Sequence, residues 1–361
     1  MEDRASAVRE ARGSGGAAAR ATAAPGAAAR AAAARGAVTP GPAIPGAVAT
    51  PGAATPGAGR YAPSPSGDLH LGNLRTALLA WLFARKSGRE FLMRIEDLDR
   101  ARDAGTGERQ LEDLASIGID WDGEPVLQTE RASDHAAAIR RLSLAGLVYE
   151  CTCTRRDILA APSAPHAPPG AYPGTCRNRT DAERAAARAA ILPRQPALRL
   201  RAPADVHELE FDDLVLGRTR GDIDDFVLRR GDGTVAYNLA VVVDDAAMGV
   251  DQIVRGDDLA PSTPRQILLQ RLLELPSPPA VEYAHVPLVL GPTGKRLAKR
   301  DGAVTLAQLR ERGITAADVL STLAVSLDLA APGERVAIDR LLARFDPAAL
   351  PRAPWTWGRP A

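Results

Sequence analysis

The spacing of apolar residues predicts a helix over residues 73–88. Apolar side chains recur there at intervals of three and four, as on one face of a helix, at Leu74, Ala77, Leu78, Trp81 and Leu82. Gly88 follows, where a helix C-cap belongs. Residues 60–62 and 90–97 on either side are typical of short strands, and the second strand ends in carboxylates.

Further along the chain the same alternation continues. A second helix is expected over residues 107–118, GERQLEDLASIG, and the valine-rich stretch VAYNLAVVV at 235–243 is typical of a strand. Strands that alternate with helices imply a mostly parallel sheet covered on both faces, the α/β fold class. In such sheets, ligands bind beyond the carboxyl ends of the strands.

Residues 1–58 differ from the rest because they form a low-complexity tract of Ala, Gly, Pro and Arg. Without large apolar residues this tract cannot offset the entropy lost on ordering, so we predict a disordered tail. Its Arg-rich, acid-poor middle faintly resembles an organelle transit peptide. A simple tail, or a start codon assigned upstream of the true start, explains it more economically.

The overall composition sets limits on size and partners. The 361 residues are 45% hydrophobic and 25% charged, enough for a sizeable core in two or three structural units. A net charge of +1 excludes general adhesion to nucleic acid, so an RNA contact requires a local patch. No apolar run approaches the roughly 20 residues of a spanning helix, and the N-terminus lacks the apolar core of a signal peptide. We expect a cytoplasmic protein without membrane contact.

The stretch RYAPSPSGDLHLGN, residues 60–73, makes a stiff entrance to the first helix. Its prolines fix φ, and Gly67 permits a tight turn. His70 falls at the first turn of the helix, where backbone amides are expected to point outward unpaired. Together these features predict an anion cradle in which the histidine donates to phosphate. Taken alone, a histidine at this place is more often a cap or a surface residue.

Several blocks of sequence resemble, in order and spacing, the class I aminoacyl-tRNA synthetases in their glutamate form. The block at residues 60–73 corresponds to the His-Ile-Gly-His signature of that family. The other blocks are RIEDLDR at 94–100, IDWDGEPVLQTER at 119–131, residues 226–259, and RLAKR at 296–300. The resemblance covers roughly residues 60–320.

This resemblance implies a Rossmann-like parallel sheet with a connective zinc-binding insertion and a short C-terminal helical region. The catalytic domain is then expected in two halves, 59–150 and 201–305, around an insertion at 151–200. Residues 306–361 follow as a helical segment without an anticodon-binding domain.

The second signature of the family, Lys-Met-Ser-Lys-Ser, corresponds to residues 296–300. Lys299 takes the place of the ATP-contacting lysine and Arg296 keeps a positive charge, whereas Ala298 lacks the hydroxyl. The resemblance assigns catalysis to His70 and Lys299, and it assigns ATP binding to these two together with Gly72, Asn73 and Arg296. Cations at this place stabilise the charge that builds on the phosphate. Mg²⁺ is expected to accompany ATP.

Recognition of L-glutamate requires a cation for the side-chain carboxylate and polar groups for the amino-acid end. By resemblance, the residues that supply them are Arg60, Ala62, Ser64, Glu96, Tyr237 and Arg255. Arginine suits bidentate binding of a carboxylate in a partly dry pocket. Glu96, at the end of a strand, is placed to bind the substrate ammonium. Each of these residues, taken alone, is more typical of a structural ion pair or a core position.

Three cysteines lie close together in the sequence, at Cys151, Cys153 and Cys176. Their odd number argues against disulfides, and three thiolates supply most of a tetrahedral zinc site. The resemblance implies Tyr172 as the fourth ligand of one structural Zn²⁺, whereas His166 is the better ligand on general chemical grounds. Three reduced thiols in a Pro-rich loop are the alternative.

The short segment after Lys299 resembles the stand-alone paralogues of the glutamyl-tRNA synthetase catalytic domain. That resemblance implies ATP-dependent, tRNA-independent activation of glutamate and its transfer to the cyclopentene diol of queuosine at the wobble position of tRNA(Asp). A truncated glutamyl-tRNA synthetase charging tRNA(Glu) and a non-catalytic RNA-binding remnant are the alternatives. A monomer is expected, with candidate RNA contacts at Arg155, Arg156, Arg177 and Arg179.

Overall fold

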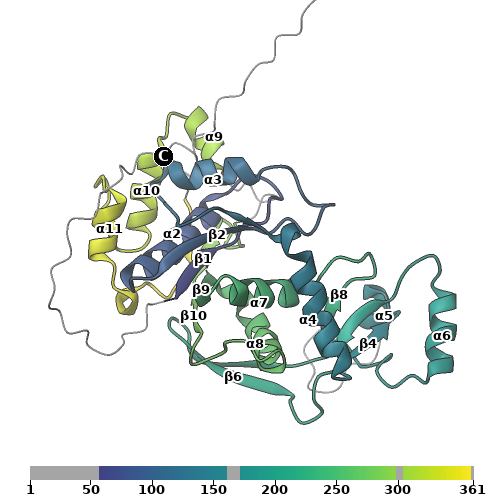
Figure 1. Ribbon diagram of the computed structural model, residues 1–361. Helices are drawn as coiled ribbons and strands as arrows, with labels where there is room; N and C mark the ends of the chain where they lie inside the picture. The colour runs from purple at the N-terminus through teal and green to yellow at the C-terminus, as the bar shows by residue number, and fades with distance from the viewer. Residues whose placement is uncertain (1–56, 161–170, 298–303, 359–361) are drawn as a thin grey trace, which may run out of the picture. The chain divides into compact units, whose positions relative to one another are not determined.

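The computed structural model describes residues 57–160, 171–297 and 304–358 (Figure 1). The predicted tail at 1–58 lies almost entirely outside the described residues. His166, Ala298, Lys299 and Arg300 lie outside them as well.

A mostly parallel sheet organises the described chain. Its seven strands within the described residues follow the order β3 (Val126–Leu127), β2 (Glu90–Ile95), β1 (Ala58–Tyr61), β9 (Val250–Gly256), β10 (Glu282–Val286), β6 (Glu208–Asp213) and β7 (Gly217–Asp222). Every neighbouring pair from β3 to β6 is parallel, and the β6–β7 pair is antiparallel. The predicted α/β fold class with a parallel-rich sheet is therefore confirmed.

The helix predicted at 73–88 is α2 (Leu71–Lys86), which lies against β1, β2 and β9. Leu74, Leu78 and Leu82 have no exposed surface, as the spacing of apolar residues requires. The helix begins at the N-cap His70 and ends before Gly88, whose φ of +73° suits a residue without Cβ. Its buried side chains share one apolar cluster with Phe91 and Met93 of β2.

Figure 1 labels the remaining helices of the described ranges. Their bounds are α3 (Gly107–Ser116), α4 (Ala132–Leu144), α5 (Arg155–Ala160), α6 (Asp181–Ala190), α7 (Tyr237–Ala247), α8 (Thr263–Leu272), α9 (Leu306–Glu311), α10 (Ala316–Val325) and α11 (Ile338–Arg344). None of the helices in the described ranges is long and apolar enough to cross a membrane.

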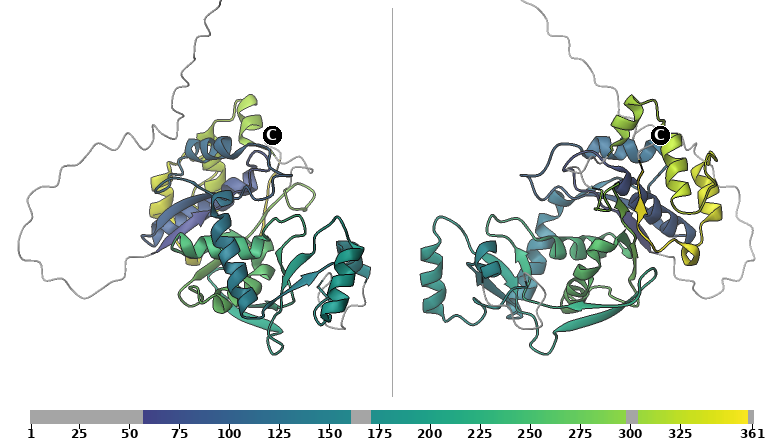
Figure 2. Two further views of the ribbon diagram at one scale, coloured as in Figure 1. Left: turned by 45° about the vertical axis from the view of Figure 1, so that its right-hand side comes forward. Right: turned by 180° about the vertical axis from the view of Figure 1, so that it is seen from behind.

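A second, small sheet carries the cysteine-containing segment. Its strands are antiparallel neighbours in the order β4 (Val148–Cys151), β5 (Ala197–Leu200) and β8 (Val227–Arg229). Helices α5 and α6 are inserted between β4 and β5, and both views of Figure 2 show them beside this sheet. The C-terminal helical region ends in β12 (Trp355–Thr356), which pairs with β11 (Val289–Leu290).

One predicted element is wrong. Residues 235–243 were expected to form a strand, but α7 begins at Tyr237. Leu239, Val241 and Val242 are buried in one apolar cluster together with residues of α4 and α8. Burial on several sides of a helix produces a continuous apolar run, which periodicity alone cannot distinguish from a buried strand.

Candidate active site

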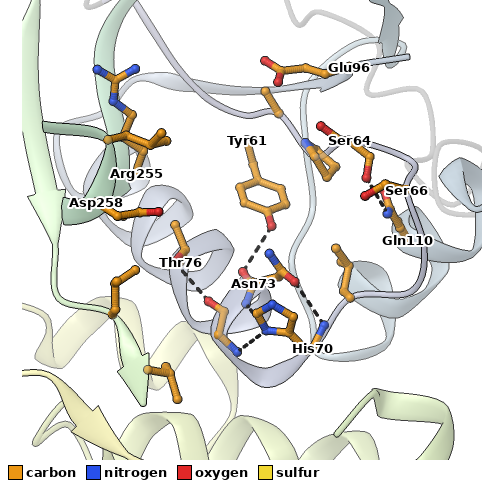
Figure 3. A pocket seen from close by; sticks show the side chains of 18 of the residues that line it. Tyr61, Ser64, Ser66, His70, Asn73, Thr76, Glu96, Gln110, Arg255 and Asp258 are labelled. Carbon is orange, nitrogen blue, oxygen red and sulfur yellow. Dashed lines mark hydrogen bonds between the residues drawn. The ribbon is translucent and has the colours of Figure 1, made fainter. Parts of the chain in front are cut away.

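A cavity of about 720 Å³ opens at the carboxyl end of the main sheet. It lies where β1 and β9 are neighbours, so that the chain leaves one strand toward β2 and the other toward β10. This change of direction is the place where open parallel sheets bind ligands. The cavity is lined by residues that follow β1, β2 and β9 and by the first turn of α2 (Figure 3).

His70 closes the first turn of α2 rather than leaving it open. Its Nδ1 accepts from the backbone N–H groups of Gly72 at 3.1 Å and Asn73 at 3.3 Å, and Asn73 Oδ1 accepts from His70 N. The expectation of unpaired amides at this helix end is therefore wrong for these two groups, because the histidine is the N-cap. Since Nδ1 accepts, the ring proton of the neutral imidazole is on Nε2, which is a donor.

Gly72 leaves room for this cap. A Cβ on Gly72 would lie 3.0 Å from His70 Cε1, closer than side chains ordinarily approach. The glycine of the first signature thus has a local role, which is to let the imidazole fold back over the helix end.

The stiff turn before His70 is held from α3 and β2. Gln110 Nε2 donates to the carbonyl oxygens of Ser64 at 3.0 Å and Gly67 at 2.6 Å. Gly67 itself has a φ of +138°, and its N–H donates to Thr106 Oγ1. Glu96 N donates to Pro63 O at 2.9 Å, which ties the turn to the end of β2. The turn is therefore rigid through tertiary contacts as well as through its prolines.

Arg60 and Glu96 belong to a buried network of charges beneath the cavity. Arg60 forms a two-pronged ion pair with Asp245, with both N···O distances at 3.2 Å. Arg94 joins the same carboxylate at 2.6 Å and also contacts Glu96 at 3.2 Å. The carboxylate-binding edge of Arg60 is thus occupied by a protein group, which sequence reasoning did not foresee.

The pKa values in this network follow from burial and pairing. Burial acts to raise the pKa of Asp245, but the charges of Arg60 and Arg94 outweigh it and the pKa lies below its ordinary value. Burial raises the pKa of Glu96 above its ordinary value, and Arg94 and Arg60 offset only part of the effect.

Arg255 has a different environment, although it lines the same cavity and is only 5% exposed. Its hydrogen-bond partners within the described residues are His285, Thr263 and Tyr237, none of which is a carboxylate. Tyr237 accepts at 3.5 Å and is 39% exposed at the first turn of α7. Figure 3 draws Arg255 and Glu96 on either side of Tyr61.

The remaining predicted residues are placed as follows. Ala62, Ser64, Gly72, Asn73 and Arg296 also line the cavity, so the described members of the predicted glutamate and ATP sets share one pocket. Arg296 is ion-paired with Asp258, whereas Leu297 is buried. Sequence reasoning missed Asp245, His285 and Gln110, since no motif singles out these partners.

The cysteine-containing segment brings its sulfur atoms together. The Sγ atoms of Cys151, Cys153 and Cys176 lie within 4.8 Å of one another. Tyr172 Oη lies 3.4 Å from Cys151 Sγ and 3.9 Å from Cys153 Sγ, and the Cys153–Cys176 distance is 3.5 Å. Ligands about 2.3 Å from a tetrahedral zinc ion are separated by just under 4 Å, so these four donors fit that ion.

The surroundings of Cys153 and Cys176 shift the pKa values of these two thiols in opposite directions. Burial and the neighbouring Cys151 raise the pKa of Cys153 to about 12. Burial also acts to raise the pKa of Cys176, but hydrogen bonds from Tyr172 and the Thr152 backbone lower it to about 7. Of these two thiols, Cys176 is therefore the one more easily converted to thiolate.

Two of the arginines predicted as candidate RNA contacts have structural partners. Arg177 is ion-paired with Asp225 and donates to Ala202 O at 2.7 Å, and Arg179 donates to Thr152 Oγ1 at 2.9 Å. They hold the segment around the cysteines to the small sheet. Arg155 and Arg156 are exposed on α5.

Comparison with known proteins agrees with this geometry. The family described as tRNA synthetases class I (E and Q), catalytic domain, matches residues 58–327. A glutamate tRNA ligase from Elizabethkingia meningosepticum, solved in complex with its amino acid, superposes with a TM-score of 0.69 at 26% identity. The superposition covers 84% of this chain and 67% of that one. The chain therefore belongs to the class I tRNA synthetases of the glutamate and glutamine type.

Within this class, several curated relatives are glutamyl-Q tRNA(Asp) synthetases. The chain is 63% identical over 298 residues to the glutamyl-Q tRNA(Asp) synthetase of Nocardia farcinica, covering 82% of this chain and 92% of the relative. It is 47% identical over 311 residues to the protein of the same name in Symbiobacterium thermophilum, covering 82% and 94%. The chain belongs to this family, and the predicted resemblance is confirmed.

Proposed function

We propose that the protein activates L-glutamate with ATP in the absence of tRNA and then transfers it to queuosine in tRNA(Asp). The observation that carries this proposal is the pocket at the carboxyl end of the sheet. It combines a rigid first-signature turn with the cation Arg255 and the carboxylate Glu96. The names of the most similar relatives supply the acceptor.

In the first step, an oxygen of the α-carboxylate of glutamate attacks the α-phosphorus of ATP. The new bond is the acyl-phosphate bond of glutamyl-adenylate, and pyrophosphate leaves with the electron pair of the broken P–O bond. The Nε2–H of His70 is a donor toward the phosphates, because Nδ1 is committed to the helix cap. Arg296, which is ion-paired with Asp258, and Lys299 are expected to bind the phosphates at the second signature, where Mg²⁺ would accompany ATP.

Within the pocket, charge assigns the two ends of glutamate. The guanidinium of Arg255 faces no carboxylate of the described chain and is available for the substrate side chain. Glu96, whose carboxylate is held by Arg94, is the partner proposed for the substrate ammonium. Arg60, whose fork is taken by Asp245, stays bound to that carboxylate at the floor of the pocket.

In the second step, a hydroxyl of the queuosine diol attacks the activated carbonyl, an ester forms, and AMP leaves. A vicinal diol resembles the ribose diol of ordinary aminoacylation, so one adenylate pocket serves either acceptor. One Zn²⁺ held by Cys151, Cys153, Tyr172 and Cys176 would fix the inserted segment and take no part in either step.

The test is glutamate-dependent ATP–pyrophosphate exchange measured without tRNA. Robust exchange supports the proposal, and transfer of labelled glutamate to tRNA(Asp) with queuosine, compared with tRNA(Asp) lacking it, then tests the acceptor. Exchange that appears only with tRNA(Glu) would show a shortened conventional synthetase. No exchange in either assay would contradict catalysis altogether and favour a non-catalytic RNA-binding protein.

A further inference from the structure

Among the described residues, the groups that form hydrogen bonds with the guanidinium of Arg255 are all neutral. Its Nε donates to His285 Nε2 at 3.1 Å, and its Nη2 donates to Thr263 Oγ1 at 2.8 Å. His285 and Thr263 have no exposed surface. Arg60, another arginine that lines the cavity, is instead held by the carboxylate of Asp245. The two arginines therefore differ in how much of their charge is already compensated.

The proton positions on His285 follow from its partners. Because Arg255 Nε is always a donor, His285 Nε2 must accept and carries no proton. The ring proton is then on Nδ1, which lies 2.6 Å from Asp213 Oδ2. The hydroxyl of Thr263, 3.1 Å from Nε2, completes the arrangement by donating to the imidazole while it accepts from Arg255.

Asp213 is itself fixed in one orientation. Its Oδ1 accepts from the backbone N–H groups of Val215 and Leu216, each at 2.9 Å, and both carboxylate oxygens lie 3.1 Å from His285 N. Burial and the neighbouring charge of Arg255 lower the pKa of His285 despite the opposing effect of Asp213, so the imidazole is neutral. Asp213, His285 and Arg255 thus form a chain from β6 across β10 to β9.

We propose that His285, oriented by Asp213, is a positioning residue that aims Arg255 at the side-chain carboxylate of glutamate while leaving its positive charge uncompensated. A carboxylate in the same place would hold the guanidinium equally well but would cancel the charge that the substrate needs. A neutral acceptor provides direction without competition. The inference rests on the proposed function, because it assumes that glutamate occupies the pocket.

The substitution Asp213→Asn tests the proton positions at almost constant shape. The N–H groups of Val215 and Leu216 require an oxygen at the Oδ1 position, so the amide nitrogen must take the Oδ2 position beside His285 Nδ1. It donates to Nδ1 and forces the ring proton onto Nε2. Nε2–H then faces Arg255 Nε–H, and the guanidinium loses its support.

Two substitutions of His285 separate its two bonds. His285→Gln places a side-chain oxygen near the position of Nε2 and so keeps an acceptor for Arg255. His285→Asn keeps a donor near the position of Nδ1, but its shorter side chain does not reach Arg255. His135→Gln is the matched control. His135 is equally buried and equally paired with an aspartate, Asp244 at 2.8 Å, but it does not line the cavity.

The experiment measures the KM for glutamate and the KM for ATP by pyrophosphate exchange, with thermal unfolding to verify folding. We expect Asp213→Asn and His285→Asn to raise the KM for glutamate about tenfold or more, as for the loss of a bond to a charged group, with the KM for ATP within about twofold. His285→Gln should restore most of the affinity. His135→Gln should lower the unfolding temperature without changing the KM for glutamate.

The inference is overturned if Asp213→Asn binds glutamate like the wild type, or if the KM values for glutamate and ATP rise together. It is also overturned if His285→Gln is as impaired as His285→Asn. A wild-type protein without glutamate-dependent exchange would contradict the proposed function instead. In that case, calorimetric titration with glutamate tests the inference by itself. Weaker binding by Asp213→Asn than by the wild type would support the inference, and equal binding would contradict it.

Discussion

The cavity at the sheet edge and the cysteine cluster of the insertion are built in opposite ways. The four donors of the cluster lie between Cys151 and Cys176, so a short segment supplies them all. The charged residues that line the cavity come from distant parts of the chain, since Arg60 lies on β1 and Arg255 on β9. One site draws its donors from a single short segment, whereas the other exists only when the parallel sheet is complete.

This difference shows what each site depends on. When the four donors of the cluster are deprotonated, their negative charges repel one another. A bound cation therefore stabilises the cluster. The cavity already contains its counter-charges, because Asp245 bridges two buried arginines and Asp213 orients a neutral histidine. Disrupting the cavity should therefore impair folding and activity together, whereas disrupting the cluster should leave glutamate recognition intact.

The largest effect is expected from Asp245→Ala. It leaves the guanidinium groups of Arg60 and Arg94 buried without their shared carboxylate, which costs about 3–5 kcal/mol in the free energy of unfolding. Urea denaturation measures the loss, and pyrophosphate exchange should be abolished.

Asp251→Ala is the matched control for this experiment. Asp251 pairs with Arg89 on the same sheet, but its side chain is 29% exposed, so the expected loss is about 1 kcal/mol or less. Equal losses for the two variants would show that the network beneath the cavity is no more important than an ordinary surface ion pair.

An intermediate effect is expected at the cysteine cluster. Cys153→Ser should reduce the zinc content from about one ion per chain to almost none and lower the unfolding temperature, with the KM for glutamate unchanged. Mass spectrometry of the purified protein measures the metal. Tyr172→Phe removes only the phenol oxygen and should weaken zinc retention against a chelator.

His166→Ala distinguishes the two candidates for the fourth ligand. If Tyr172 is the ligand, this variant retains zinc as the wild type does. Loss of zinc from His166→Ala but not from Tyr172→Phe would reverse the assignment, and unchanged zinc in Cys153→Ser would eliminate the site.

The smallest effect concerns pH. Burial lowers the pKa of His285 below its ordinary 6.5, with Arg255 and Arg60 adding to the shift and Asp213 opposing it. As the pH falls below 6.5, the unfolded chain therefore binds a proton at His285 that the folded chain does not, and stability falls. The slope contributed by this residue is at most about 1.4 kcal/mol per pH unit.

Urea denaturation at about pH 7.5 and about pH 5.5 measures this slope in the wild type and in His285→Gln. The variant lacks the group and should lose less stability on acidification. An equal loss in both proteins would mean that His285 titrates at the same pH in the folded and unfolded chains.

The sequence by itself determined the local features of the protein. The spacing of apolar residues predicted α2 and the strands before and after it, because the 3.6-residue period of a helix is a property of neighbouring positions. The ordered motifs predicted the family, and the spacing of the cysteines indicated the cluster. The roles of individual site residues stay predictions until the variants above are measured.

Only the tertiary structure decided which groups face one another. Residues 237–243 lie in a helix, α7, whose buried side chains share an apolar cluster with residues of α4 and α8. The carboxylate of Asp245 forms an ion pair with Arg60, whereas the neutral imidazole of His285 accepts a hydrogen bond from Arg255. No local pattern encodes these pairs, since the charge that an arginine presents to a substrate depends on the groups that packing places behind it.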